Sequence, residues 1–196
     1  MAGEPASVDS DLIRIFPEIE AIEDATLREG VIAAWQTALE ENPDIDIAAM
    51  PWGAYHDDIT GESQVDHIRQ VTQHAVSIAE VMCEHRPGLE LDMDRLLASA
   101  LLHDVSKCYE MTDGGTEFST IGDLLPHPVL AVSVLHRHDM PIEIIHNVFA
   151  HTHQTATVPV TIEGKIVKLA DIVTLEALSW DHRGRPHNRV ETSHYG

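Results

Sequence analysis

Histidine and aspartate side chains interrupt apolar rows that would otherwise form the core of a helical protein. Leu97, Leu101 and Asp104 are spaced i, i+4 and i+7, so a carboxylate replaces the next core residue on one helix face. His103 lies next to Asp104 in the sequence, and both side chains can converge on one point. Because an unpaired carboxylate is strongly disfavoured in an apolar interior, Asp104 must be protonated, paired or coordinated.

The same interruption recurs elsewhere in the chain. Asp171 shares a predicted helix face with Val167 and Leu178, and His67 lies beside Val71 at the edge of an apolar stripe. A single residue of this kind is more simply a satisfied core histidine or an aspartate paired with arginine, but inward-facing Arg and Lys are scarce here. A divalent metal centre would account for all the positions together. The candidate ligands are His67, His103, Asp104, His127, His151 and Asp171.

The charge of the chain limits the class of its partners. The sequence holds 33 acidic and 12 basic residues, a formal net charge of −21 with neutral histidines. A surface of that sign repels nucleic acid polymers, whose binding requires clustered Lys and Arg. It does not exclude a small phosphorylated substrate, because a metal ion can reverse the potential inside a pocket. We therefore expect no nucleic acid partner, and the sequence is compatible with a homodimer.

The sequence also favours a cytoplasmic location. No apolar run approaches the roughly 20 residues of a membrane-spanning helix, and the acidic, polar residues 1–10 are unlike a secretory signal. The two cysteines, Cys83 and Cys108, show no spacing typical of a disulfide framework or a zinc site. We expect both to be free thiols in a reducing compartment, and we expect no contact with a membrane.

Helical periodicity predicts an all-α fold, organised as a single-domain bundle. Residues 1–62 are expected to form N-terminal helices and a loop that pack on the core, 63–180 the metal-binding helical core, and 181–196 a C-terminal tail. In the first part, residues 9–42 predict two helices, one of them opened by Pro17. The Pro- and Gly-containing loop that follows could lie over a site.

The core region carries clear helix boundaries. Ser63 with Asp66 resembles a capping box, and Asp92 is suited to cap the helix that leads to the His103-Asp104 doublet. The elements expected after the doublet are a Gly- and Thr-rich loop at 112–122, helices over 128–138, 141–151 and 164–180, and a short extended piece at 157–162.

The order and context of the candidate ligands resemble a known family. His67, the His103-Asp104 doublet and Asp171 lie in the segments DHIRQVTQHAVSIAE, ASALLHDVSK and IVKLADIV. This arrangement resembles the HD-domain superfamily of metal-dependent phosphohydrolases, over about residues 63–180. The usual pattern has Gly where this chain has Ser106. The resemblance implies an all-α fold of the HD type and a metal-dependent phosphohydrolase or phosphodiesterase.

The resemblance also implies how divalent ions, iron or manganese, are held, following the two-metal branch of the superfamily. Asp104 would bridge the two ions, and His153 competes with His151 for the last ligand position. The first ion would be bound by His67, His103, Asp104 and Asp171, and the second by Asp104, His127 and His151.

The implied reaction is hydrolysis of a phosphate ester or anhydride in a small, nucleotide-like substrate by a metal-activated water. Asp104 and Lys107 are the candidate catalytic residues, and Lys107 would neutralise charge on the phosphate. From the residues alone, Lys107 could equally be a solvated lysine at a helix end. Weaker candidates for the pocket are His56, Asp57 and Asp58 in the loop, and Arg183 and Arg185 in an otherwise solvent-exposed tail.

Two other functions share the implied ligand set. Some HD-domain relatives use a di-iron centre and oxygen to cleave C–C or C–P bonds, and the segment SQVDH resembles those oxygenases. The other alternative is a non-catalytic, ligand-sensing domain, which would have no need for an open pair of ions. Iron content and oxygen uptake, measured against phosphate release, would separate the two enzymatic functions.

Overall fold

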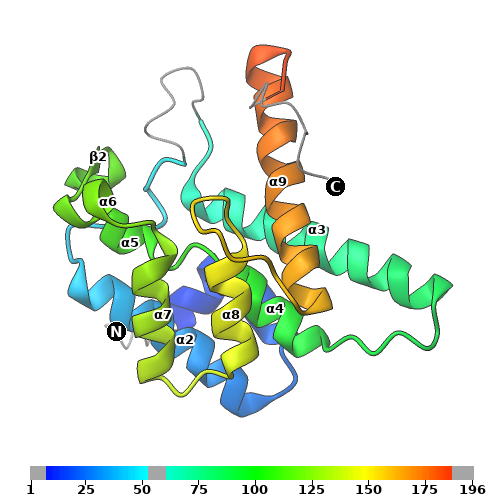
Figure 1. Cartoon of the computed structure of the whole chain (residues 1–196). Helices are drawn as coiled ribbons and strands as arrows, with labels where there is room; N and C mark the ends of the chain where they lie inside the picture. The colour runs from blue at the N-terminus through cyan, green and yellow to red at the C-terminus, as the bar shows by residue number, and fades with distance from the viewer. Residues whose placement is uncertain (1–7, 53–60, 187–196) are drawn as a thin grey trace, which may run out of the picture.

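The computed structural model describes residues 8–52 and 61–186 (Figure 1). This part of the chain is built from helices and one short hairpin, which confirms the predicted all-α class. The elements are α1 (Val8–Ile15), the 3-10 helix η1 (Pro17–Ala21), α2 (Ala25–Glu41), α3 (Gln64–His85), α4 (Met93–Leu102), α5 (Lys107–Glu110), β1 (Met111–Thr112), the 3-10 turn η2 (Asp113–Gly115), β2 (Glu117–Phe118), α6 (Thr120–Leu124), α7 (Pro128–Arg137), α8 (Ile142–Ala150) and α9 (Ile162–Arg183).

Helix α4 forms the centre of the bundle. Every residue from Leu96 to Leu102 is buried, so this half of the helix is covered on all sides. Leu97 and Leu101 pack in a core shared with η1, α2, α7 and α8, whereas Leu96 and Ala100 pack with α3 and α9 in a second core. Because α4 ends between these two cores, the His-Asp doublet that follows it lies deep inside the molecule.

Helix α2 ties the N-terminal segments to α4. Trp35 is fully buried, and its indole Nε1 donates a hydrogen bond of 3.1 Å to the carbonyl oxygen of Leu101. The ring of Phe16 packs against this indole, with the ring centroids 5.1 Å apart. The segments before residue 42 therefore share one core with α4.

The prediction of two helices over residues 9–42 was wrong, because the structure has three helical segments there. Pro17 opens only the short 3-10 helix η1, and the chain breaks before α2. At the break, the backbone N–H groups of Glu23 and Asp24 donate to the carboxylate of Asp94, at 2.9 and 2.8 Å. A contact with a residue so distant in sequence replaces helical hydrogen bonds, and local periodicity does not reveal it.

Helices α3 and α9 cover the other side of α4. The predicted capping box is present at the start of α3, where the side chains of Ser63 and Asp66 each accept a hydrogen bond from the other's backbone N–H. Helix α9 begins before residue 164 and ends after residue 180, so it is longer than predicted. Thr161 caps its start, and Gly184, with φ at 61°, ends it in the left-handed conformation that favours glycine.

The start of α9 is held against α8 by a close contact. The buried amide of Asn147 donates to Ser99 Oγ at 3.1 Å and accepts from Thr161 Oγ1 at 2.5 Å. A Cβ atom on Gly164 would lie 2.4 Å from Asn147 Oδ1, so a side chain does not fit there without a shift. These contacts set the distance between α8 and α9 near the site.

Two connecting stretches differ from their predicted form. Residues 112–122, predicted as a loop, hold most of a small hairpin, with Met111 opposite Phe118, followed by α6. Residues 157–162, predicted as an extended piece, form no strand in the described structure. Strand formation needs a neighbouring strand, which the sequence alone does not identify, and Thr161 instead caps α9.

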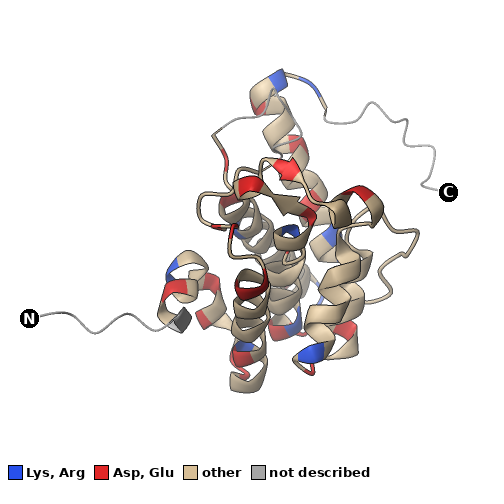
Figure 2. Cartoon of the chain, turned by 90° about the vertical axis from the view of Figure 1, so that its left-hand side faces the viewer, with Lys and Arg blue, Asp and Glu red and all other residues tan. Residues whose placement is uncertain are grey.

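The described helices differ in length, and charged residues are spread over them (Figure 2). Within residues 8–52 and 61–186, every helix is too short or too polar to cross a membrane. Figure 2 shows Asp and Glu spread over many helices and loops, with Lys and Arg at scattered positions among them.

Candidate metal centre

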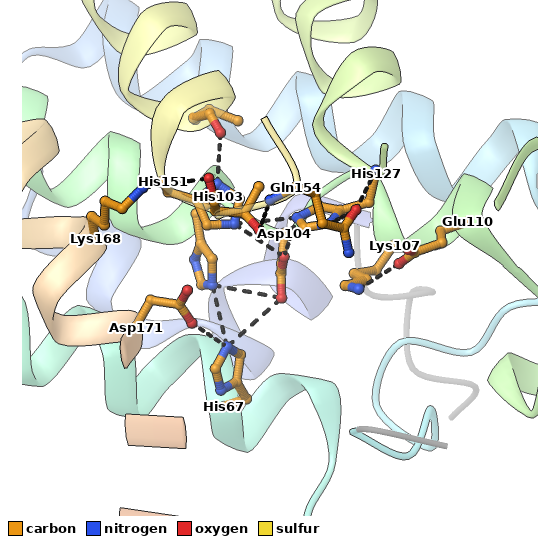
Figure 3. Close-up of polar contacts among 12 residues, drawn as sticks. His67, His103, Asp104, Lys107, Glu110, His127, His151, Gln154, Lys168 and Asp171 are labelled. Atoms are coloured by element: carbon orange, nitrogen blue, oxygen red, sulfur yellow. Dashed lines mark hydrogen bonds and ion pairs between the residues drawn. The ribbon is translucent and has the colours of Figure 1, made fainter. Parts of the chain in front are cut away.

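The structure brings all the predicted metal ligands to one place inside the bundle (Figure 3). His67 comes from α3, the His103-Asp104 doublet from the end of α4, and Asp171 from α9, while His127 precedes α7 and His151 follows α8. We call His67, His103 and Asp171 the first cluster, and His127 and His151 the second cluster. One potential ligand atom from each member of the first cluster lies within 4.8 Å of those of the other two members.

Asp104 lies between the two clusters, with one carboxylate oxygen toward each. Its Oδ2 is 3.7 Å from Nε2 of His67 and 3.6 Å from Nε2 of His103. Its Oδ1 is 3.3 Å from Nε2 of His127 and 3.7 Å from Nε2 of His151. A carboxylate placed in this way can bind one ion through each oxygen.

Backbone and side-chain acceptors fix the orientation of three imidazole rings. Nδ1 of His103 lies 2.7 Å from the carbonyl oxygen of Ala100, and Nδ1 of His151 lies 2.6 Å from that of Val148. Because a carbonyl oxygen only accepts, both Nδ1 atoms carry the proton and both Nε2 atoms carry a lone pair. The two rings are thus held in the Nδ1-protonated tautomer. A metal-binding histidine of this kind binds the ion through Nε2 and donates its Nδ1–H to an acceptor that is not itself a ligand.

The ring of His127 is oriented by Gln154. The side-chain Oε1 of Gln154 lies 3.2 Å from both the backbone nitrogen and Nδ1 of His127. Because this amide oxygen accepts a hydrogen bond from Nδ1–H of His127, the lone pair of the ring is on Nε2, as in His103 and His151.

The donor set fits a divalent cation. Nε2 of His67 is 3.3 Å from Nε2 of His103, and Nε2 of His127 is 3.2 Å from Nε2 of His151. The lone pairs of His127 and His151 face each other at this distance and repel unless a proton or a cation lies between them. In the described part of the chain, Nδ1 of His67 is also buried without a hydrogen-bond partner. Imidazole and carboxylate donors of this kind suit zinc, iron or manganese.

Burial favours the neutral form of two imidazoles of the site, those of His103 and His151. Burial, together with the nearby His103 and His127, lowers the pKa of His151 to about 3. Burial likewise lowers the pKa of His103, although Asp104 opposes this effect. Neutral imidazole is the form that binds metal, so the site needs no deprotonation of these rings at neutral pH.

The two carboxylates of the site are ionised. Burial opposes the charge on Asp171, but the hydrogen bond and charge of His67 outweigh it and lower the pKa of Asp171 to about 2. Burial also opposes the charge on Asp104, but His103 and the other neighbours outweigh it and hold its pKa well below the usual value. Buried negative charge with so few protein cations nearby favours the binding of a metal cation.

A cavity of about 300 Å³ opens onto the centre. Its apolar wall is formed by Trp52, Ile172 and Leu175, and the ring of Trp52 lies 5.2 Å from that of His67, centroid to centroid. Lys107 and Lys168 contribute positive charge to the lining. A volume of this order is within the range of small-molecule sites.

Lys107 is buried, which argues against the alternative of a solvated lysine at a helix end. It begins the separate short helix α5, and its Nζ donates to a carboxylate oxygen of Glu110, which is also buried. Figure 3 shows this pair beside Asp104. Lys107 lines the cavity. Its predicted role of neutralising charge on the phosphate stays a prediction.

The structure separates the remaining candidates. His151 is buried beside His127, whereas His153 is exposed at the cavity rim. Arg183 and Arg185 are absent from the described lining of the cavity. The weaker candidates His56, Asp57 and Asp58 lie outside the described residues.

Sequence reasoning missed several residues that contact the centre. Gln64 donates to Asp104 and lies three residues before His67 on α3, so its helical spacing placed it on the ligand face. Lys168 has the same spacing relative to Asp171 on α9. Gln154 lies in an irregular loop, where no periodicity indicates which way a side chain points.

Comparison with known proteins agrees with the fold. The family model of the HD domain matches residues 65–175, and the chain belongs to this family. HD domains bind divalent metals, and two groups in the described residues could hold such an ion. These groups are His67, His103 and Asp171, and His103, Asp104 and His151.

The chain is similar to a dihydroneopterin 2',3'-cyclic phosphate phosphodiesterase of Methanocaldococcus jannaschii, with 37% identity over 111 residues. The matched part covers 55% of this chain and 44% of the relative, so the chain matches less than half of the relative's length. No solved structure matches the chain at a significant level.

Proposed function

We propose that the protein is a metal-dependent phosphohydrolase or phosphodiesterase that acts on a phosphate ester or anhydride in a small, nucleotide-like substrate. The observation that carries this proposal is the position of Asp104, whose two oxygens face two separate groups of imidazoles. A carboxylate shared by two ions is typical of hydrolytic centres with paired metals.

The chain offers two ligand sets for these ions. His67, His103 and Asp171 with Asp104 would hold the first ion, and His127 and His151 with Asp104 the second. Two divalent ions bound in this way supply a water of lowered pKa and a positive charge that polarises a phosphoryl oxygen. Imidazole and carboxylate donors support iron or manganese as the ions.

The cavity supports a substrate with one charged and one flat apolar part. Lys107 would bind the phosphoryl oxygens, because its ammonium lines the cavity beside Asp104. Trp52, Ile172 and Leu175 would contact a heterocycle and exclude water from that side. The relative's action on the 2',3'-cyclic phosphate of dihydroneopterin supports a substrate of this kind.

Asp104 and Lys107 would have different roles in the reaction, one as a metal ligand and the other as a cation near the phosphoryl group. Asp104, whose carboxylate is ionised, would be a ligand to both ions. Lys107 would neutralise negative charge that builds on the phosphoryl group. The rings of His103 and His151 would keep their orientation through the carbonyl acceptors on Nδ1.

The cellular setting forms part of the same proposal. Both cysteines are free, one half-buried and one buried, which suits a reducing cytoplasm. A homodimer is compatible with the proposal, but no step of the reaction requires a second chain.

The proposal is tested on protein purified without chelators. Metal content is measured first, and phosphate release or ring opening is then followed with nucleotides and 2',3'-cyclic phosphates as substrates. We expect metal-dependent hydrolysis that a chelator abolishes and that added manganese or iron restores. Asp104→Asn should abolish hydrolysis, because a neutral amide cannot neutralise two cations.

The same preparation tests the alternatives. Oxygen uptake without phosphate release, by a protein that contains iron, would replace the hydrolase with an HD-type oxygenase. Absence of turnover on every phosphate ester after metal reconstitution would favour a ligand-sensing domain.

A further inference from the structure

Lys168 contacts the centre in a way that the proposed reaction does not use. Its Nζ donates to the carbonyl oxygens of Ala150 and Thr152, at 3.3 and 3.4 Å. These two residues flank His151 in the sequence, so one ammonium group holds the backbone on both sides of a second-cluster ligand. Lys168 lies on α9, three residues before Asp171 of the first cluster, and Figure 3 shows it beside His151.

The end of α8 needs hydrogen-bond partners from outside the helix. The last carbonyl groups of an α-helix have no partner within it. Here His151 Nδ1 bonds the carbonyl of Val148, and Thr155 Oγ1 donates to that of Phe149 at 3.1 Å. Lys168 serves the next carbonyl, and its positive charge also complements the negative end of the helix dipole.

The position of Lys168 is unusual for a lysine on an outer helix. Burial lowers its pKa, and the charge of Asp171 only partly opposes this effect. Lys165, one turn earlier on the same helix, is exposed to solvent. A lysine that is half-buried and bonded to two backbone carbonyls stabilises the structure it contacts, here the turn that carries His151.

We propose that Lys168 is a positioning residue that makes binding of the second ion depend on the placement of α9. Helix α9 supplies Asp171 to the first cluster and, through Lys168, holds His151 of the second cluster. Binding of the first ion to Asp171 holds α9 in place and therefore also holds His151. The two ions then bind cooperatively. This inference rests on the proposed pair of ions but not on the nature of the substrate.

The inference is tested with the full-length, metal-free protein and Co²⁺ alone. Calorimetry measures the number and affinity of bound ions, and the visible absorption of Co²⁺ reports the coordination of each equivalent. Lys168→Met should keep the first equivalent and weaken the second by about 10–100-fold, the usual effect of removing a group that orients a ligand. Lys165→Met is the matched control and should bind like the wild type. Lys168→Arg should restore most of the second affinity, since its guanidinium can also donate to two carbonyls.

A second measurement needs no metal. Amide hydrogen exchange of the metal-free protein should become faster at residues 149–155 in Lys168→Met, and stay unchanged there in Lys165→Met. Wild-type Co²⁺ binding or wild-type exchange in Lys168→Met would overturn the inference, as would an equal loss of both equivalents. Failure of the proposed hydrolysis would give a different result. The wild type would still bind two ions and Lys168→Met would still weaken only the second, but no phosphate would be released.

Discussion

Gln64 Nε2 donates a hydrogen bond of 2.7 Å to Oδ2 of Asp104, and both side chains are buried. This bond restrains rotation of the carboxylate about its terminal torsion. The other oxygen, Oδ1, is thereby kept toward His127 and His151. An amide on α3 thus helps to hold Asp104 in the orientation that serves both clusters.

Replacing Gln64 by Leu should weaken metal binding by about 10–100-fold, because a ligand carboxylate loses the group that orients it. Leu has a similar volume, so the core should remain filled. Co²⁺ titration by calorimetry measures the change. Gln70→Leu is the control, since Gln70 is exposed on the same helix and its amide donates to Glu62. Equal affinities in Gln64→Leu and the wild type would show that the bond does not support the centre.

Lys107 and Glu110 form a buried pair. Variants of both residues can therefore separate the proposed role of the Lys107 ammonium in the reaction from its effect on the free energy of unfolding. Lys107→Met leaves Glu110 without this cation and should lower the free energy of unfolding by about 3–5 kcal/mol. Lys107→Met combined with Glu110→Gln should be more stable than the single variant. We expect the double variant to lose about 10²–10³-fold in kcat, as when one group that stabilises transition-state charge is removed.

Urea unfolding and phosphate release measure the two effects on the same samples. Glu110→Gln alone shows what the loss of the carboxylate contributes. A double variant that folds and retains the wild-type kcat would remove Lys107 from the reaction.

The stability of the metal-free protein should depend on pH through His151. Its pKa is about 3 in the folded protein, against 6.5 as the ordinary value. Below pH 6.5 the unfolded chain therefore binds a proton that the folded protein does not, and stability falls as the pH drops from about 6.5 to about 3. Urea unfolding at several pH values should show this slope.

His151→Gln should reduce the slope in that pH range, because it removes the group that the unfolded chain protonates. His136→Gln, a change at an exposed position on α7, serves as the control and should leave the slope as in the wild type. If His151→Gln and the wild type lose stability equally, burial of this imidazole does not govern the acid sensitivity.

Gly164→Ala should destabilise the protein by about 1–3 kcal/mol, because the added methyl group collides with a buried side chain. Its Cβ would lie 2.4 Å from Oδ1 of Asn147, which is itself hydrogen-bonded to Thr161. Gly88→Ala is the matched control, since nothing lies within 4 Å of a Cβ at that position. Urea unfolding of both variants checks the difference, and equal stabilities would mean that Asn147 moves freely.

The helices that carry the clusters could be predicted because their apolar spacing and caps are local properties of the sequence. Ser63 and Asp66 marked the start of α3, and Asp92 accepts from the backbone N–H of Arg95 at the start of α4, as predicted. The proximity of Asp104 and Asp171 could be expected for a related reason, since each replaces a residue on an apolar face. Such faces meet in the core.

Contacts between segments distant in sequence could not be predicted in the same way. The break before α2 depends on Asp94, far along the chain, and the orientation of His127 depends on Gln154 in an irregular loop. The burial of Lys107 depends on the turn at residues 103–106, which ends α4 and is followed by a new short helix. Each of these features is decided by tertiary partners that local spacing does not specify.

The burial of the second half of α4 on every side has a consequence for how this protein can acquire new specificities. Substitutions there disturb both cores at once, so the ligand framework tolerates little variation. Adaptation to other leaving groups should instead use the cavity wall formed by Trp52, Ile172 and Leu175. A library randomised at these positions should change which esters are cleaved while the affinity for Co²⁺ is retained.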